Sequence, residues 1–346
     1  MNSEEINYQF ALPKNYDANN AEFDVFKSFK RDAKCSKAKT KLFNNIRISN
    51  NSILFNYFKI IEESCISPEN FKKYSKGYKF FLKFIFPHFN FSKKRFLLIT
   101  DEWTSNYYHW HIFALQKLIA LQENNLVNDA LLFLPKKYLR YSFVLPSLAK
   151  FGIKNDRIDF LRRKSNIKAK SVATATVDQH DPIITRKLRE QILTHTTKID
   201  LGFGERIYIS RDGQKLRNVV NEKEVVELLE KYGFKKIITD KLSYDDQINI
   251  CRQAKYLISP HGAGLTNILF MQEGSNVIEL ATKPNLRVKP VSDYYKLCSN
   301  LNINYIYHEC EMHGNFAQEH EYDFHQAQLF VDIAKLEKNL QIMFQK

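Results

Sequence analysis

One run of short apolar segments constrains the fold of the second half of this chain most strongly. KYLIS (residues 255–259) has the length of a buried strand, and SPHGAGLTN follows it directly. ILFMQ then predicts a helix, and SNVIELA (275–281) predicts the next strand. Earlier in this half, RIYISR (206–211) and KKIITD (235–240) predict two more strands. Strands that alternate with helices favour a parallel sheet that is covered on both faces.

Helix boundaries in this half carry local signals. Asn221 and Glu224 resemble a capping box at the start of a helix over residues 222–232, and Gly233 predicts a left-handed end for that helix. Ser243, followed by Asp246, predicts the start of a further helix that continues through Ala254. These signals predict helices in both crossovers between the strands.

The first half repeats the alternation less clearly. RFLLIT (95–100), ALLFLP (130–135) and residues 157–161 predict strands, whereas residues 106–118 and 139–151 predict helices. Residues 1–90 look mostly helical and loop-like. Because 346 residues fit two domains better than one, we expect an α/β fold with two Rossmann-like domains facing a cleft. The expected parts are a basic helical N-terminal extension (1–90), a first domain (91–203), a second domain (204–310) and a tail (311–346) with an amphipathic helix.

The charge of the chain is uneven. Of the formal net charge of +14, an excess of 9 lies in residues 1–100, which hold 18 basic and 9 acidic side chains. Lysines alternate with aromatic residues there, as in FKKYSKGYKFFLKFIF. Such a surface suits nucleic acid, an anionic membrane or a polyanionic glycan, and an ordinary solvated basic face is the alternative.

Composition narrows the cellular setting. No apolar run approaches the roughly 20 residues of a membrane-spanning helix, and MNSEEINYQF lacks the features of a signal peptide. The five cysteines are odd in number and show no CxxC pairing, so we expect reduced thiols and neither disulfides nor a zinc site. These features predict a cytoplasmic protein, with contact to the inner membrane as a further expectation.

SPHGAGLTN lies where a parallel strand turns into a helix. The first amides of a helix have no partners within the helix and attract anions. Gly262 and Gly264 remove side chains that would keep a diphosphate away, and the Thr266 hydroxyl adds a donor. A tight turn is the alternative reason for the glycines. Since neither GxGxxG nor a P-loop occurs, the pattern predicts a nucleoside diphosphate site of another kind.

Three charged residues fit beside this turn. Glu279 ends the following strand and could accept hydrogen bonds from ribose hydroxyls. Arg211 and Arg217 flank a glycine-containing loop after the strand RIYIS, where forked donors suit phosphate oxygens. An ordinary surface glutamate and ordinary surface arginines are the alternatives. No Asp-x-Asp, HExxH or His/Cys cluster with metal-ligand spacing occurs, which favours a reaction without a metal ion.

DEWTSNYYHWH follows the strand RFLLIT and holds the candidate bases. Asp101, Glu102, His109 and His111 can take up a proton, and histidine does so near neutral pH. Asn106, Tyr108 and Trp110 could bind or stack against a sugar. The alternative is that this aromatic helix start belongs to the hydrophobic core.

Three blocks of sequence carry a family resemblance: NYYHW with the helix after it (106–118), RIYISRD to RNVVNE (206–222), and ISPHGAGLTNILFMQEGSNVIEL (258–280). In these blocks the chain resembles glycosyltransferase family 61, inverting enzymes of GT-B-like fold that use nucleotide sugars. The resemblance implies that 91–203 is the acceptor domain, that 204–310 is the donor domain, and that His109 faces the cleft. It also implies a nucleotide-sugar site lined by Arg211, Arg217, His261, Gly262, Gly264, Thr266, Asn267 and Glu279.

The sequence therefore predicts an inverting, metal-independent glycosyltransferase. We expect the donor to be a UDP-sugar, with no cofactor besides this substrate, and the acceptor to be a glycan or lipid-linked glycan. As the base we rank His109 first, before Asp101 and Glu102, and we expect His261 to contact the donor. Eukaryotic members carry signal or anchor segments and disulfides, so we expect a bacterial or viral enzyme of surface polysaccharide synthesis. A non-catalytic polyanion-binding module with a vestigial nucleotide pocket is the alternative, and nucleic acid is the least expected partner.

Overall fold

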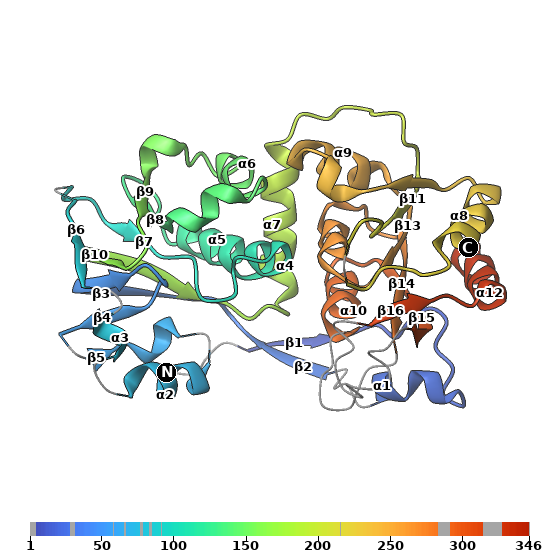
Figure 1. Ribbon diagram of the computed structural model, residues 1–346, viewed down its shortest axis with the longest axis horizontal. Helices are drawn as coiled ribbons and strands as arrows, with labels where there is room; N and C mark the ends of the chain where they lie inside the picture. The colour runs from blue at the N-terminus through green and yellow to red at the C-terminus, as the bar shows by residue number, and fades with distance from the viewer. Residues whose placement is uncertain are drawn as a thin grey trace. The chain divides into compact units, whose positions relative to one another are not determined.

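The structure, a computed structural model, describes residues 5–27, 32–57, 59–65, 67–76, 79–82, 85–90, 92–214, 216–282, 291–313 and 327–345. The chain, coloured from blue to red in Figure 1, divides into two compact units. Unit 1 contains Ser36–His195, and unit 2 contains Glu5–Cys35 together with Thr196–Lys346. Unit 2 therefore takes residues from both ends of the chain.

Unit 2 is built on a six-stranded sheet with the order β12-β11-β13-β14-β15-β16. Its first five strands are parallel, and β16 runs antiparallel to β15. The strands are β11 (Arg206–Ile209), β12 (Lys235–Ile237), β13 (Tyr256–Pro260), β14 (Asn276–Thr282), β15 (Asn304–His313) and β16 (Gln328–Phe330). This is the strand order of a doubly wound sheet in which the winding direction reverses between β11 and β13.

Helices cover both faces of this sheet, with α8 and α12 on one side and α9 and α10 on the other (Figure 1). Val225 of α8 and Leu336 of α12 pack against Ile258 and Ile278, which point to the same face of the sheet. The helices are α8 (Glu222–Lys231), α9 (Tyr244–Gln253), α10 (Val291–Asn300) and α12 (Ile333–Phe344), with the 3₁₀ helices η6 (Thr239–Lys241) and η7 (Ala263–Phe270).

Local signals for helix ends are confirmed in part. Gly233 follows α8 with a φ of 74°, and the Ser243 side chain accepts a hydrogen bond from the Asp246 amide at 3.1 Å. The capping box at Asn221 is wrong. The Asn221 side chain caps no amide of α8 and instead bonds both the carbonyl and the amide of Val331, at 2.9 and 3.0 Å. A tertiary partner thus replaces the local one.

The N-terminal segment of unit 2 packs onto the sheet that the second half of the chain forms. Phe26 makes an edge contact with Tyr307 at 5.4 Å between ring centroids, and Tyr8 donates a hydrogen bond to the Ser299 carbonyl at 2.5 Å. Its elements are β1 (Glu5–Gln9), η1 (Ala21–Phe23), α1 (Asp24–Lys27) and β2 (Asp32–Ser36), of which β1 and β2 form a small sheet of their own.

Unit 1 contains an eight-stranded mixed sheet with the order β5-β4-β3-β10-β7-β8-β9, in which β6 also pairs with β10. The long strands β3 and β10 are antiparallel, whereas β10, β7, β8 and β9 are parallel neighbours. The strands are β3 (Lys39–Ser49), β4 (Leu54–Asn56), β5 (Lys59–Ile60), β6 (Phe86–His88), β7 (Phe96–Leu97), β8 (Leu131–Pro135), β9 (Ile158–Leu161) and β10 (Ser165–Thr176).

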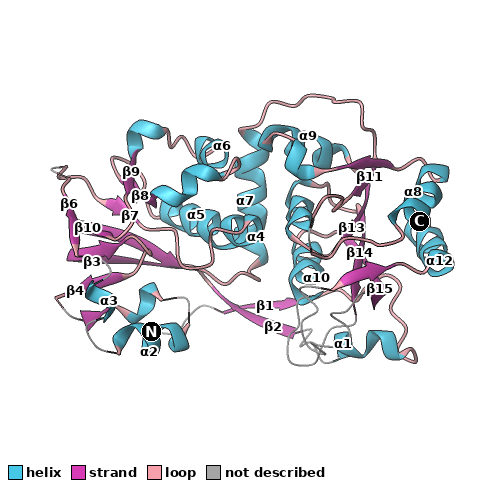
Figure 2. Ribbon diagram, viewed as in Figure 1, coloured by secondary structure: helices cyan, strands magenta, loops and turns pink. Residues whose placement is uncertain are grey.

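Two helices of unit 1, α5 and α7, lie together on one face of this sheet (Figure 2). The helix after Asn106 is continuous but contains a π-helical segment, η3, between α4 and α5. The helices are η2 (Glu62–Ser64), α2 (Pro68–Ser75), α3 (Lys79–Leu82), α4 (Tyr107–His109), η3 (Trp110–Leu115), α5 (Gln116–Glu123), η4 (Lys136–Arg140), α6 (Val144–Ala149), η5 (Asn155–Arg157) and α7 (Pro182–Thr194).

Residues 1–90 differ from the expected helical extension. Their described part holds six strands and joins both units rather than standing apart. The longest strand within residues 1–90, β3, has an irregular alternation because its first half is largely exposed, and its partner β10 lies more than 100 residues away. Strand formation there depends on pairing that the local sequence does not show. The same strands make the sheet of unit 1 mixed, where a parallel Rossmann-like sheet was expected.

None of the helices in the described ranges is long and apolar enough to cross a membrane. No disulfide joins the five cysteines, all of which lie in the described ranges, and four of them are buried.

Candidate functional site

The predicted site lies at the carboxyl ends of β11 and β13 in unit 2. These neighbouring strands flank the point where the winding of the sheet reverses, and in open α/β sheets ligands bind in the crevice outside that point. The loop after β11 carries Arg211 and Arg217, and the turn after β13 carries His261 and Gly262. The fold therefore brings together residues that are about 50 positions apart in the sequence.

Both guanidinium groups lie over Gly262. A Cβ atom on Gly262 would stand 2.4 Å from Nη1 of Arg211 and 3.8 Å from Cζ of Arg217. Arg211 is fixed in this place because its Nε and Nη2 donate to the Leu216 carbonyl at 3.2 and 3.1 Å. Gly262 is thus needed for two reasons: its φ of 153° is one that residues with a side chain rarely adopt, and the Arg211 side chain occupies the space of a Cβ atom.

Positive charge at this point is not neutralised. Neither arginine forms an ion pair with a carboxylate in the described part of the chain, and the buried Nε of Arg217 has no hydrogen-bond partner there. Burial lowers the pKa of both side chains, that of Arg211 to about 10 with a further contribution from Arg217. Both remain protonated at neutral pH. Two cations that repel each other in a half-buried site are stabilised by an anion.

His261 is held by a buried carboxylate. Its Nδ1 lies 2.5 Å from Oε1 of Glu279, and the Tyr305 hydroxyl donates to Oε2 of Glu279 at 2.6 Å. Glu279 is completely buried, whereas the His261 side chain is partly exposed. A carboxylate only accepts, so Nδ1 carries the proton and Nε2 is the nitrogen left for a ligand.

This geometry corrects the expected role of Glu279. Its two oxygens are occupied by His261 and Tyr305, and no part of its side chain reaches the surface, so it is not placed to bind ribose hydroxyls. Glu279 instead fixes the ring orientation of His261.

Sequence reasoning also missed two residues on α10. The Tyr294 ring makes an edge contact with His261 at 5.3 Å between centroids. Burial raises the pKa of Asp293 to about 6, an effect that nearby His261 opposes. Their position in the chain order could have indicated both residues. They lie at the start of α10, which follows β14, and a helix that follows a parallel strand starts at the edge of the sheet where the strands end.

The remaining predicted residues support the turn from within. Gly264 packs against β11, where a Cβ atom would stand 3.1 Å from Cγ2 of Ile209. Thr266 and Asn267 are fully buried, and Asn267 donates to Oε1 of Gln247 on α9 at 3.2 Å. Their burial argues against the expectation that Thr266 and Asn267 line a ligand site, and Asn267 anchors η7 to α9.

The candidate bases lie in unit 1, after β7. Asp101 is buried, accepts the amides of Trp103 and Thr104 at 3.0 and 3.1 Å, and pairs with Lys117 at 3.0 Å. It stabilises its own turn, which argues against a role as a base. Glu102 accepts a hydrogen bond from Asn70 of α2 at 3.2 Å and is also engaged by Tyr74.

His109 is the predicted base with a free atom. Its buried Nδ1 has no hydrogen-bond partner among the described residues, and burial lowers its pKa, so the imidazole is neutral at pH 7. His111, by contrast, is completely buried and bonded to the Tyr107 carbonyl at 2.8 Å.

The aromatic residue that is exposed at this place is Trp103. It is 51% exposed and lies 5.5 Å from His109 between ring centroids, whereas Trp110 is completely buried and its Nε1 bonds Ser147. Of the aromatic residues proposed to meet a sugar, Tyr108 is buried as well. Trp103 is exposed and Trp110 is buried, and the sequence pattern did not predict this difference.

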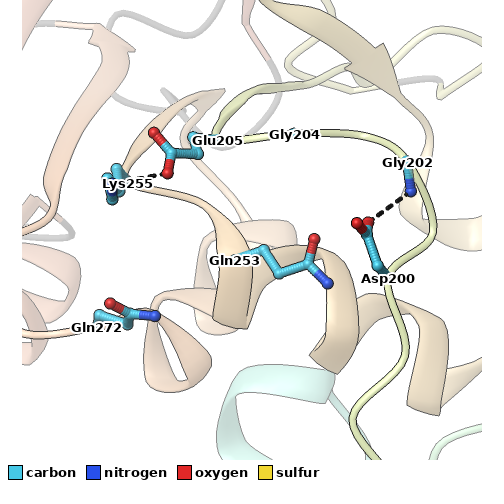
Figure 3. Close-up of a pocket in the computed structure, with 7 residues that line it drawn as sticks. All are labelled: Asp200, Gly202, Gly204, Glu205, Gln253, Lys255 and Gln272. Atoms are coloured by element: carbon cyan, nitrogen blue, oxygen red, sulfur yellow. Dashed lines mark hydrogen bonds and ion pairs between the residues drawn. The ribbon is translucent and has the colours of Figure 1, made fainter.

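A pocket of about 500 Å³ lies elsewhere in unit 2, at the amino ends of β11 and β13 (Figure 3). Its charged groups have partners within the lining: Lys255 pairs with Glu205 at 2.6 Å, and Asp200 accepts the Gly202 amide at 2.8 Å. Because it opens at the edge of the sheet opposite to the arginines, it is separate from the candidate site. No cluster of three or more His, Cys, Asp or Glu side chains suited to a metal ion occurs within the described ranges.

The fold and the site define an α/β protein in which two arginines, without a carboxylate partner in the described residues, lie at the switch point of a parallel sheet. Comparison with protein families adds a match to the model of glycosyltransferase 61 over residues 107–278, which reach from α4 into β14. Residues 107–278 belong to glycosyltransferase family 61. A relative from Drosophila melanogaster, the EGF domain-specific O-linked N-acetylglucosamine transferase, is 38% identical over 76 residues. These residues cover 21% of this chain and 14% of that protein.

Proposed function

We propose that this chain transfers a sugar from a nucleoside diphosphate donor to a hydroxyl group of a glycan. The observation that carries the proposal is the pair of guanidinium groups, Arg211 and Arg217, which lie over Gly262 without a carboxylate partner in the described chain. Forked guanidinium donors match the oxygens of a diphosphate in geometry and charge. Membership in the family supports sugar transfer as the reaction that uses this anion.

For the donor we propose a UDP-sugar. The name of the Drosophila relative contains N-acetylglucosamine, so UDP-N-acetylglucosamine is the first donor to test. Nε2 of His261 is directed to the donor in this proposal, because its other nitrogen is bound to Glu279.

The proposed reaction is a single displacement with inversion. The acceptor oxygen attacks the anomeric carbon from the face opposite the diphosphate, and the bond from that carbon to the diphosphate oxygen breaks. The electron pair stays on the diphosphate, where Arg211 and Arg217 stabilise the added charge. Since these side chains supply the positive charge at the leaving group, we propose that no divalent cation is required.

For the base that takes the acceptor proton we propose His109. A neutral imidazole can accept a proton at once, and burial keeps His109 neutral at pH 7. Trp103 beside it offers an exposed indole face on which the apolar face of an acceptor sugar can stack.

A screen of nucleotide sugars for hydrolysis and transfer tests this function. We expect turnover with a UDP-sugar in the presence of EDTA, and a decrease in kcat of about 10²- to 10⁴-fold in His109→Ala. His195 is an exposed histidine at the end of α7, so His195→Ala is the matched control. This variant should have the turnover of the wild type.

Three outcomes would count against parts of the proposal. Normal turnover of a folded His109→Ala variant excludes His109 as the base. Loss of activity in EDTA that Mn²⁺ restores excludes the metal-independent mechanism. Binding of UDP with no turnover of any donor or acceptor favours the non-catalytic alternative.

A further inference from the structure

Several large apolar side chains on and around the strand β6 are exposed in unit 1. Leu82, Ile85, Phe86 and Phe89 are 57%, 56%, 57% and 73% exposed, and we call these four residues the apolar edge. They lie within eight positions of one another, and β6 is at an extremity of unit 1 (Figure 2). Single exposed apolar residues are ordinary on a protein surface, but a contiguous group indicates an interaction site.

The apolar edge is held in place by the fold. β6 pairs in parallel with the start of β10, so that Phe86 stands opposite Ser165 and His88 opposite Ile167. Asp159 of β9 then fixes the following residues, since it bonds Nε2 of His88 at 3.0 Å and Nδ2 of Asn90 at 2.5 Å. Phe86 is therefore presented by a paired strand, and Phe89 follows directly after its end.

Basic side chains lie directly beside the apolar edge. Arg162, Arg163 and Lys164 form the exposed turn between β9 and β10. Because Phe86 is paired with Ser165, this turn ends next to Ile85 and Phe86. Lys93 and Lys94 are exposed a few residues after Phe89. None of these five cations forms an ion pair with a described residue.

We propose that the apolar edge and the basic turn together bind the surface of an anionic lipid membrane. Aromatic and aliphatic side chains enter the boundary between headgroups and acyl chains, and neighbouring lysines and arginines contact lipid phosphates. Acidic side chains of a partner protein would pair with the cations, but they would not bury the four apolar side chains. A membrane surface satisfies both parts of the site, and the interaction requires no helix that crosses the bilayer.

Vesicle flotation tests this binding with the full chain. Vesicles of phosphatidylcholine are compared with vesicles in which about one third is phosphatidylglycerol. We expect wild-type protein to float with the anionic vesicles and to bind neutral vesicles about tenfold less. The double variants Phe86→Ser with Phe89→Ser and Arg162→Ser with Arg163→Ser should each lose about tenfold in binding to anionic vesicles.

Matched controls come from the same unit. Ile183→Ser removes an apolar side chain that is 44% exposed on α7, and Lys154→Ser removes an exposed cation, so both should float like the wild type. UDP binding should be unchanged in all variants, which verifies that they fold and separates this proposal from the proposed function.

Two results would overturn the membrane proposal. One is a wild-type protein that stays unbound with anionic vesicles, or double variants that float as well as the wild type does. The other is a wild-type dimer in sedimentation velocity that the Phe86→Ser, Phe89→Ser variant loses, with no vesicle binding by either protein. That second result would assign the apolar edge to a second copy of this chain.

Discussion

At the scale of single residues, Gly262 shows how the site depends on close approach. The sequence marks this glycine as unusual, and the structure supplies a reason that the sequence does not contain: the Arg211 guanidinium occupies the space of a side chain at residue 262. The glycine therefore determines where the positive charge of the crevice lies.

Gly262→Ala should weaken nucleotide binding and also destabilise the fold, because residue 262 has a φ of 153°, which residues with a side chain rarely adopt. The new methyl group would stand 2.4 Å from Nη1 of Arg211, so the guanidinium must move, and its end is flexible enough to do so. We expect the Kd for UDP to rise at least about tenfold, measured by calorimetry.

Gly204→Ala is the control for this variant. Gly204 also has a positive φ, 76°, but no atom lies within 4 Å of its Cβ position. We expect it to lower stability by about 1 kcal/mol with UDP binding unchanged. Equal UDP affinity in Gly262→Ala and wild type would contradict the role of this close contact.

The same scale shows what sequence reasoning can find in a site. Arg211, Arg217 and His261 are brought together as the strand ends predict, because parallel strands place their carboxyl ends at one edge. Burial and partners within the protein were beyond the sequence pattern. Glu279 is buried and bonded to His261, so it supports that histidine instead of facing a ligand. Trp103 is exposed, whereas Trp110 is buried.

At the scale of elements, the parallel strands of unit 2 were predictable and the strands before residue 90 were not. β13 and β14 are short apolar runs bounded by turn residues, so a local pattern defines them. β3 forms as a strand by pairing with β10, and β1 lies in a segment that packs with unit 2. The formation of both strands therefore depends on distant partners. Local periodicity carries no information about such partners.

Asn221 links two such distant elements, and its removal should destabilise unit 2. Asn221→Ala would leave the amide and carbonyl of Val331, a completely buried residue, without their hydrogen bonds of 3.0 and 2.9 Å. We expect the free energy of unfolding to fall by about 2–4 kcal/mol in urea denaturation.

A cap that acts only within its own helix provides the comparison. Ser243→Ala removes the side-chain hydrogen bond to the Asp246 amide at the start of α9 and should cost about 1 kcal/mol. If Asn221→Ala costs no more than Ser243→Ala, the bonds to Val331 do not contribute as a tertiary link.

At the scale of the whole molecule, each unit contains a histidine that burial keeps neutral. Burial lowers the pKa of His111 in unit 1 to about 4 and that of His308 in unit 2 to about 3. The unfolded chain binds these protons below about pH 6.5, and the folded chain does not. The contribution of these two histidines to the free energy of unfolding is therefore fully present above about pH 6.5. It is lost as the pH falls towards the pKa that each histidine has in the folded chain.

We expect thermal unfolding at pH 7 to 5 to show this loss, at about 1.4 kcal/mol for each histidine and pH unit. Asp293 acts in the opposite sense in unit 2, because its raised pKa of about 6 lets the folded chain bind a proton first. The loss should thus be clearer in unit 1, and His111→Gln should flatten it. A pH dependence that His111→Gln leaves unchanged would contradict this account.

The central claim is that Arg211 and Arg217 form the diphosphate site, and calorimetric titration of UDP in EDTA tests it most directly. We predict that wild-type protein binds UDP and that the Arg211→Gln, Arg217→Gln double variant loses at least about tenfold in affinity, or about 1.4 kcal/mol. Arg206→Gln, at the other end of β11, should bind UDP like the wild type. No heat of binding for wild-type protein, or equal affinity in the double variant, would contradict the account.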